Sequence, residues 1–132
     1  MKNSLSSVNI LIVDDDPIAR MLAKRNLEIA GFKGSITSAE NGQEGFDILS
    51  KSHKDLIVIL DFHMPELDGI GLLKKLKLHH INPPVFMLSS SFLTENKDTC
   101  MSHSCVQDYF IKPMDQFKSK AIIEFANQYV DA

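Results

Sequence analysis

The chain reads LIVILDFHMPELDG from residue 56 to residue 69. The first five of these residues are apolar and include three β-branched side chains, which is typical of a strand. Asp61 ends this run with an acidic side chain, a loop that contains a proline follows, and Gly69 begins a helix. The stretch therefore predicts a strand, an acidic residue at its carboxyl end and then a helix.

The same alternation of short apolar runs and longer amphipathic stretches continues on both sides of this segment. The predicted strands cover residues 9–13, 35–38, 56–60, 85–88 and 109–111. The predicted helices cover residues 17–30, 43–50, 69–79, 94–104 and 115–129. Each pair of parallel strands needs a crossover connection, so five alternations predict an α/β fold with helices on both faces of a parallel sheet. No Pro-rich or Ser-rich linker divides the pattern, which indicates one domain.

Local signals place the ends and faces of two helices. Asp16 is expected to cap the first helix, and Thr94 is expected to cap the fourth. In the first helix, Ile18, Leu22 and Ile29 recur at helical spacing. These three side chains share one helical face.

Composition limits the kind of partner. A length of 132 residues suits one domain, and a hydrophobic fraction of 44% with a formal net charge of -3 is ordinary for a globular protein. The charge gives no reason to expect nucleic acid or an anionic membrane as partner. No apolar stretch approaches the roughly 18 residues of a membrane-spanning helix, and the N-terminal segment does not resemble a secretory signal. We therefore expect a cytoplasmic protein.

The two cysteines are interpreted as packing residues. Cys100 and Cys105 do not form a disulfide framework, and free cysteines are often small, partly buried hydrophobes. Together with His103 they offer only three zinc ligands, at a spacing that is not that of the familiar zinc fingers. A metal site there is disfavoured.

Polar and charged side chains follow the predicted strands at the point where each strand ends. Asp14 and Asp15 follow the first strand, Asp61 the third, Ser89 the fourth and Lys112 the fifth. In open parallel sheets the functional crevice lies at the carboxyl ends of the strands. We therefore expect three carboxylates, a hydroxyl and an ammonium to meet at one edge of the sheet.

Such a group of carboxylates needs a cation. Two like charges about 4 Å apart repel by roughly 4 kcal/mol at an effective dielectric constant of about 20. Oxygen ligands with room for water suit Mg²⁺, and a divalent ion beside a lysine is common equipment for stabilising a phosphoryl group in transfer. A carboxylate can itself be the nucleophile and form an aspartyl phosphate.

Four segments together resemble the response regulator receiver domain of two-component signalling. They are residues 10–17 (ILIVDDDP), 60–69 (LDFHMPELDG), 87–90 (MLSS) and 109–113 (YFIKP). Each motif alone is weak, but the four occur in the correct order over about residues 8–130. The resemblance implies a flavodoxin-like, doubly wound (βα)5 fold whose five parallel strands lie in the order 2-1-3-4-5.

The resemblance also implies a role for each acidic residue. Asp61 would be the phosphoacceptor. Asp15 and Asp61 would bind Mg²⁺ directly, the main-chain carbonyl of His63 would be a further ligand, and Asp14 would act mainly through water.

The remaining site residues would stabilise the phosphoryl group and transmit its presence to the surface of the domain. Lys112 would pair with Asp61 and then with the phosphoryl oxygens, and its peptide bond to Pro113 would be cis. Ser89 would turn inward to donate a hydrogen bond to the phosphoryl group, and Tyr109 would follow it from an outward to an inward rotamer. This pair of side chains would change the face formed by the fourth helix, the fifth strand and the fifth helix.

These roles describe a phosphoacceptor domain of a two-component phosphorelay. A sensor histidine kinase or a histidine phosphotransfer protein would supply the phosphoryl group, and an unidentified downstream protein would be regulated or would receive the phosphoryl group in turn. We expect no enzyme activity beyond self-phosphorylation from phosphodonors and self-dephosphorylation. Residues 1–7 are expected to be a short tail and residues 8–130 the receiver domain, without an output domain, as a monomer or a weak phosphorylation-dependent dimer.

Three alternatives come from other classes of protein. A phosphatase with an aspartate nucleophile would have its nucleophile after the first strand and a second acid two residues later. A flavin-binding electron carrier would have a Ser/Thr/Gly-rich phosphate loop after the first strand, where this chain has three acidic residues. A pseudo-receiver that binds proteins without being phosphorylated would keep the fold but not need the intact acids and Lys112.

Overall fold

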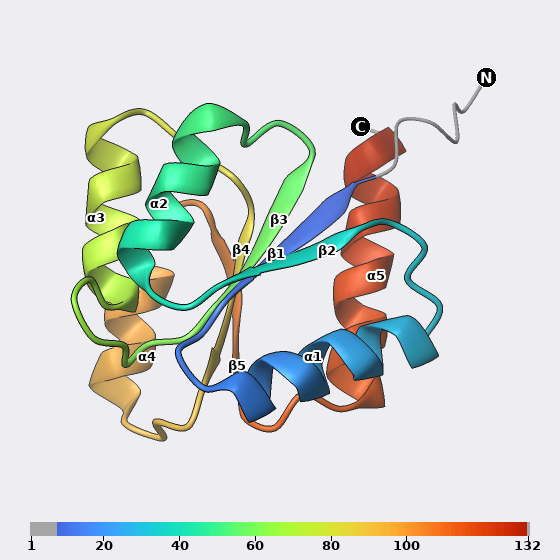
Figure 1. Ribbon diagram of the computed structural model, residues 1–132. Coiled ribbons are helices and arrows are strands. Elements are labelled where there is room, and N and C mark those ends of the chain that lie inside the picture. The colour runs from blue at the N-terminus through green and yellow to red at the C-terminus, as the bar shows by residue number, and fades with distance from the viewer. Residues whose placement is uncertain (1–7, 132) are drawn as a thin grey trace.

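The computed structural model describes residues 8–131 and has one parallel five-stranded sheet (Figure 1). The strands are β1 (Asn9–Val13), β2 (Ile36–Ala39), β3 (Leu56–Leu60), β4 (Val85–Ser89) and β5 (Val106–Ile111). They lie in the order β2-β1-β3-β4-β5, and every neighbouring pair is parallel. The predicted fold class and strand order are confirmed. The predicted tail at residues 1–7 lies outside the described residues.

Five helices connect the strands and cover both faces of the sheet. They are α1 (Pro17–Ile29), α2 (Gly42–Lys51), α3 (Gly69–Leu78), α4 (Thr94–Met101) and α5 (Gln116–Asp131). Helices α1 and α5 lie together on one face, and α2, α3 and α4 lie on the other (Figure 1). None of the helices in residues 8–131 has the length and apolar character needed to cross a membrane.

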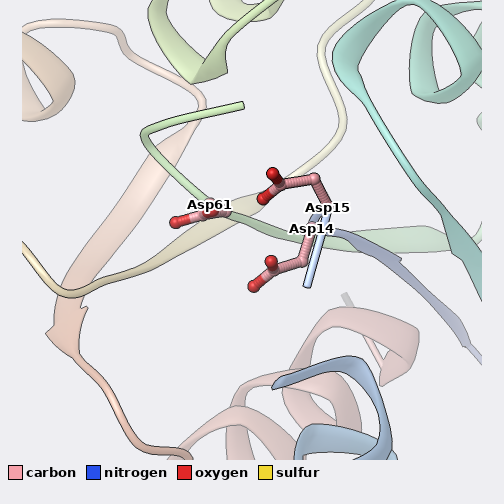
Figure 2. Close-up of side chains that lie close together, drawn as sticks. All are labelled: Asp14, Asp15 and Asp61. Atoms are coloured by element: carbon pink, nitrogen blue, oxygen red, sulfur yellow. The ribbon is translucent and has the colours of Figure 1, made fainter. Parts of the chain in front are cut away.

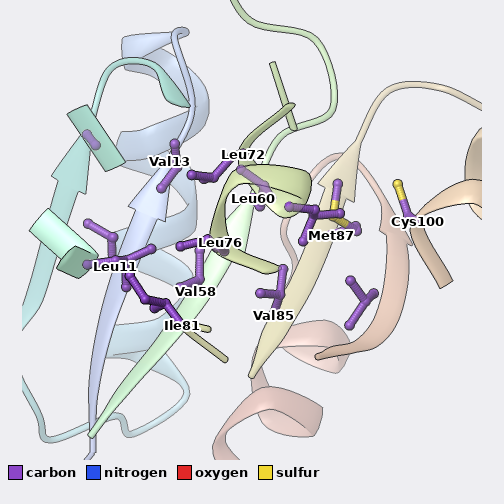
Figure 3. Packing of buried hydrophobic residues seen from close by; sticks show 14 of the residues in the cluster. Leu11, Val13, Val58, Leu60, Leu72, Leu76, Ile81, Val85, Met87 and Cys100 are labelled. Atoms are coloured by element: carbon purple, nitrogen blue, oxygen red, sulfur yellow. The ribbon is translucent and has the colours of Figure 1, made fainter. Parts of the chain in front are cut away.

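Alternating strand residues supply two separate cores. In β1, Leu11 and Val13 belong to the core under α2, α3 and α4 (Figure 3). Ile10 and Ile12 belong to the core under α1 and α5. Side chains alternate between the faces of a strand, so a continuous apolar run is required where both faces are covered.

The buried face of α1 is not the apolar face that carries Ile18 and Ile29. Ile18 and Ile29 are 62% and 65% exposed, whereas Ala23 and Leu27 are fully buried. Ala23 and Leu27 are four residues apart, so they also share a helical face. A small alanine allows the helix to approach the sheet closely, and this advantage is not visible when only large apolar residues are counted.

The segment between β4 and β5 also differs from the prediction. The residue before α4 is Leu93, with no side-chain hydrogen bond to cap the helix, so Thr94 is not the N-cap. Helix α4 ends at Met101 rather than at Ser104, and β5 begins at Val106 rather than at residue 109. Helix α4 is polar on nearly all sides and buries only Cys100, so its sequence has little periodicity from which to place its ends.

The cysteines pack as expected for small hydrophobes. Cys100 is fully buried in the core under α4, and Cys105 packs against the same core. Burial raises the pKa of the Cys100 thiol to about 11, which keeps it protonated.

Candidate functional site

The strand ends bring three acidic side chains together. Asp14 and Asp15 follow β1, Asp61 follows β3, and their side chains lie close together (Figure 2). One carboxylate oxygen from each residue lies within 4.8 Å of the other two. Asp14 and Asp61 are 3% and 6% exposed, while Asp15 is exposed to solvent. Within residues 8–131 this is the only group of three or more His, Cys, Asp or Glu side chains placed to hold a metal ion.

The register of the sheet places these acids. Val13 of β1 pairs with Leu60 of β3, so the residues that follow them leave the sheet side by side. The Asp61 N–H donates to the Val13 carbonyl at 2.9 Å, and the Asp14 N–H donates to the Ala39 carbonyl at 3.0 Å. The ladder of backbone hydrogen bonds therefore continues through both acidic residues and fixes where their side chains start.

Lys112 reaches the same site from β5. Its Nζ lies 2.8 Å from Asp14 Oδ2 and 3.5 Å from Asp61 Oδ1. The sequence predicted a pairing with Asp61, and the structure shows that Lys112 pairs with both acids and lies closer to Asp14. The Lys112 N–H donates to the Ser89 carbonyl at 2.8 Å, which anchors the end of β5 to the end of β4. The Lys112–Pro113 peptide bond is cis, as expected.

Asp14 is held on two sides. Its Oδ1 accepts a hydrogen bond from the Asp16 N–H at 2.9 Å, and its carbonyl accepts one from Arg20 Nη1 at 2.7 Å. Asp16 in turn caps α1, because its Oδ1 accepts from the Ile18 N–H. Sequence reasoning identified the cap but missed Arg20. The available signal was a basic residue in the first turns of a helix that begins directly after the acids.

The backbone around Asp61 is closely packed. Its Oδ1 accepts a hydrogen bond from the Phe62 N–H at 2.9 Å, and the Gly69 N–H donates to the Phe62 carbonyl at 3.0 Å. A Cβ atom on Gly69 would lie 2.5 Å from the Asp61 carbonyl oxygen, which is too close for any side chain. Glycine at the first position of α3 therefore allows the helix to start directly against the backbone of Asp61 and Phe62.

The surroundings of Asp61 and Lys112 raise the pKa of both side chains. Burial, together with the nearby charge of Asp14, raises the pKa of Asp61 from 3.8 to about 6, although Lys112 and the Phe62 N–H act in the opposite direction. Burial alone would lower the pKa of Lys112, but its hydrogen bond to Asp14 and the charges of Asp14 and Asp61 outweigh burial and raise it. Lys112 is therefore charged at neutral pH, and Asp61 takes up a proton at a higher pH than an ordinary aspartate.

Ser89 and Tyr109 are joined through the loop that follows β4. Ser89 is fully buried, and its Oγ accepts a hydrogen bond from the Ser91 N–H at 3.0 Å. Tyr109 is 7% exposed, and its hydroxyl donates to the Ser91 carbonyl at 3.1 Å. The Tyr109 side chain is therefore buried in this structure, and its change of rotamer stays a prediction. Asn96 Nδ2 donates to Ser91 Oγ at 2.7 Å, which connects the same loop to α4.

His63 lies beside the acids, on the loop after Asp61. Its side chain is exposed, and its ring makes an edge contact with Phe62 at a centroid distance of 4.7 Å. The metal-binding role of its main-chain carbonyl stays a prediction.

The comparison with known protein families decides the identity. The model of the response regulator receiver domain matches residues 10–124, which includes every acidic residue of the site as well as Ser89 and Lys112. The chain belongs to this family. The predicted resemblance to this family is confirmed, and the chain is a receiver domain of two-component signalling.

Individual relatives agree with this assignment. The receiver domain is 36% identical over 121 residues to the probable chemotaxis protein CheY of Rhizobium etli, covering 89% of this chain and 90% of that protein. It is 30% identical over 125 residues to the regulatory protein AtoC of Escherichia coli, covering 94% of this chain but 26% of AtoC. The receiver domain of the Francisella response regulator 1452 superposes with a TM-score of 0.78 at 31% identity, covering 93% of this chain and 98% of that one.

Proposed function

We propose that this receiver domain accepts a phosphoryl group on Asp61 and transmits the event by a change at its surface. The observation that carries the proposal is the position of Asp61. Its carboxylate is 6% exposed, shares a site with two further acids and lies 3.5 Å from a lysine ammonium. A carboxylate in such surroundings is equipped to act as a nucleophile toward a phosphoryl group.

The surplus of negative charge supports a divalent cation at this site. Three carboxylates face one ammonium, and the Asp14–Lys112 contact leaves most of the negative charge on Asp15 and Asp61 unneutralised. All available ligand atoms are oxygens, which fits Mg²⁺. Asp15 and Asp61, with Asp14 acting mainly through water and the His63 carbonyl as a further ligand, would hold the ion. When bound, Mg²⁺ would neutralise charge on the phosphoryl oxygens.

The chemical step is a simple transfer. One oxygen of the Asp61 carboxylate forms a bond to phosphorus as the bond from phosphorus to the donor nitrogen of a phosphohistidine breaks. The imidazole leaves with the electron pair and takes up a proton. Lys112 stays charged throughout, since its pKa is raised, and it can pair with a phosphoryl oxygen next to Asp61. The phosphohistidine belongs to a sensor histidine kinase or a histidine phosphotransfer protein.

Ser89 and Tyr109 would carry the signal away from Asp61. If the Ser89 hydroxyl turns to donate to the phosphoryl group, its bond from the Ser91 N–H is lost. Ser91 also accepts from Tyr109 and Asn96, so a change there would reach β5 and α4 together. The output would be binding to a downstream protein or onward transfer, and the only chemical activity of the domain would be phosphorylation and dephosphorylation of itself.

Intact-mass measurement tests the proposal. The protein is incubated with acetyl phosphate and Mg²⁺, and a parallel sample contains a chelator. We expect the mass of one phosphoryl group to appear only with Mg²⁺, and to be absent in Asp61→Asn. Glu124→Gln, which changes an exposed acid on α5, is the matched control and should be phosphorylated normally. Absence of added phosphate in the unchanged protein would overturn the proposal and favour a pseudo-receiver.

A further inference from the structure

A hollow lies between α1 and the edge strand β2, outside the acidic site. Its volume is about 290 Å³. The floor is apolar and includes Ile12, which is 2% exposed, and Ile36, while Met21 from α1 forms part of the wall. Ligand pockets usually hold about 300 Å³ or more, so this hollow suits a small ligand with an apolar body.

Two cations line the hollow on the α1 side. Arg20 and Lys24 are four residues apart, so they lie one above the other on the same face of the helix. Like charges at this spacing destabilise a helix, and a bound anion would relieve this repulsion. None of the residues that line the hollow is acidic. The positive charge of the hollow is therefore not neutralised by its own lining.

Arg20 is already held in place for binding. Its Nη1 donates to the Asp14 carbonyl at 2.7 Å, which fixes the guanidinium and leaves its other N–H groups available. A side chain that is fixed before binding loses less conformational entropy when a ligand arrives. Within residues 8–131 Lys24 has no hydrogen-bond or ion-pair partner, so its ammonium is available as well.

Strand β2 supplies a hydroxyl on the opposite side. Ser38 pairs with Ile12 in the register of β1 and β2, and paired residues of parallel strands face the same side of the sheet. Because Ile12 belongs to the core under α1, Ser38 lies on the α1 side as well. Its hydroxyl is exposed and has no hydrogen-bond partner among the described residues. A hydroxyl opposite two cations completes a set of donors suited to a carboxylate.

We propose that this hollow binds a small organic carboxylate with an apolar tail. The tail lies on Ile12 and Ile36, and the carboxylate lies between Arg20, Lys24 and Ser38. Arg20 connects the hollow to the acidic cluster through its bond to the Asp14 carbonyl, but no carboxylate of that cluster lines the hollow, and the proposal does not depend on phosphorylation of Asp61. Charge selects the ligand: an amine with the same tail would be repelled, and an alcohol would lack the ion pairs.

Nuclear magnetic resonance titration of the ¹⁵N-labelled protein tests the proposal. The probes are octanoate, octanol and octylammonium, which share one alkyl chain and differ in the head group. We expect octanoate to shift the backbone signals of residues 20–24 and 36–38 in a saturable manner. Octanol and octylammonium should bind about tenfold more weakly or worse, since hydrogen bonds to charged groups are among the stronger ones.

Matched variants locate the head group. Lys24→Gln should weaken octanoate binding about tenfold, and Ser38→Ala should weaken it less. Lys120→Gln, which changes an exposed lysine on α5, should leave the affinity unchanged. The proposal is overturned if octanoate shifts signals elsewhere or none, if octylammonium binds as tightly as octanoate, or if Lys24→Gln and Lys120→Gln bind octanoate equally well.

Discussion

The ammonium of Lys112 lies closer to Asp14 than to Asp61, at 2.8 Å against 3.5 Å. The lysine therefore neutralises Asp14 more fully, and the Asp61 carboxylate keeps a pKa of about 6, well above its ordinary value. This division of contacts holds one acid as a fixed counter-ion and leaves the other available for reaction. It also makes the stability of the domain depend on Lys112 and on pH.

Replacing the lysine should destabilise the domain. In Lys112→Met the two buried carboxylates lose their only cation among the described residues. We expect a loss of about 1–3 kcal/mol in the free energy of unfolding near pH 7, because the site is partly open to solvent and screening reduces the full cost of a buried unpaired charge. The loss should be smaller near pH 5, where Asp61 is largely protonated. Urea unfolding at both pH values measures it.

The control for this variant is Lys120→Met. Lys120 is an exposed lysine on α5, away from the acids, and its replacement should change stability little at either pH. Equal losses in the two variants would show that the contacts of Lys112 with the acids do not stabilise the fold.

The raised pKa of Asp61 predicts a pH dependence of known sign. Well below pH 3.8 the carboxyl is protonated in both the folded and the unfolded chain, and no penalty arises. As pH rises from the ordinary value of 3.8 toward about 6, the unfolded chain ionises first, so the folded state loses stability. A shift of this size corresponds to about 3 kcal/mol, which solvent screening at the rim reduces to about 1–2 kcal/mol.

Asp61→Asn should remove this penalty. Without metal, we expect the variant to be more stable than the unchanged protein by about 1–2 kcal/mol above about pH 6, with a flatter stability profile between about pH 4 and 6. Urea unfolding across this range measures both effects. A variant that is less stable than the unchanged protein at every pH would contradict the assigned cause, which is burial and repulsion by Asp14.

The sequence predicted most of the fold because each local signal agreed with the next. The run from Leu56 to Leu60 is continuous and apolar, and β3 has these bounds in the structure. It predicted α1 less well, since Ala23 and Leu27 rather than Ile18 and Ile29 form its buried face. Burial against the sheet depends on how closely the helix can approach, which is a property of the tertiary structure.

The membership of the site was predictable, but its internal contacts were not. Residues that end parallel strands must meet at one edge, so Asp14, Asp61 and Lys112 could be grouped from sequence alone. The shorter distance from Lys112 to Asp14 and the bond from Arg20 to the Asp14 carbonyl depend on side-chain reach across the crevice. No spacing along the chain encodes those distances.

Magnesium should stabilise the folded protein through the acidic cluster. A ligand that binds only the folded state at about one hundred times its Kd adds about 2.7 kcal/mol. We expect Mg²⁺ to raise the free energy of unfolding by an amount of this order, and Asp15→Asn to reduce the gain because it removes the exposed carboxylate of the trio. Glu124→Gln should keep the full gain. An equal response in all three proteins would exclude the cluster as the binding site.

The close contact at the start of α3 should be intolerant of a side chain. In Gly69→Ala the added Cβ would lie 2.5 Å from the Asp61 carbonyl oxygen, so the loop that follows Asp61 or the helix must move. We expect a loss of about 2 kcal/mol or more in stability and a shifted backbone signal for Asp61. Gly71→Ala is the control, because its nearest contact is the end of the flexible Leu67 side chain. A harmless Gly69→Ala would contradict the described packing.

The most direct test of the account identifies the residue that carries the phosphoryl group. The protein is treated with acetyl phosphate and Mg²⁺, reduced with borohydride, digested and analysed by peptide mass spectrometry, since reduction converts an aspartyl phosphate to homoserine. The account predicts this conversion at Asp61 and nowhere else. Conversion at Asp14, Asp15 or another acid instead, or no conversion in a sample whose intact mass shows added phosphate, would contradict it.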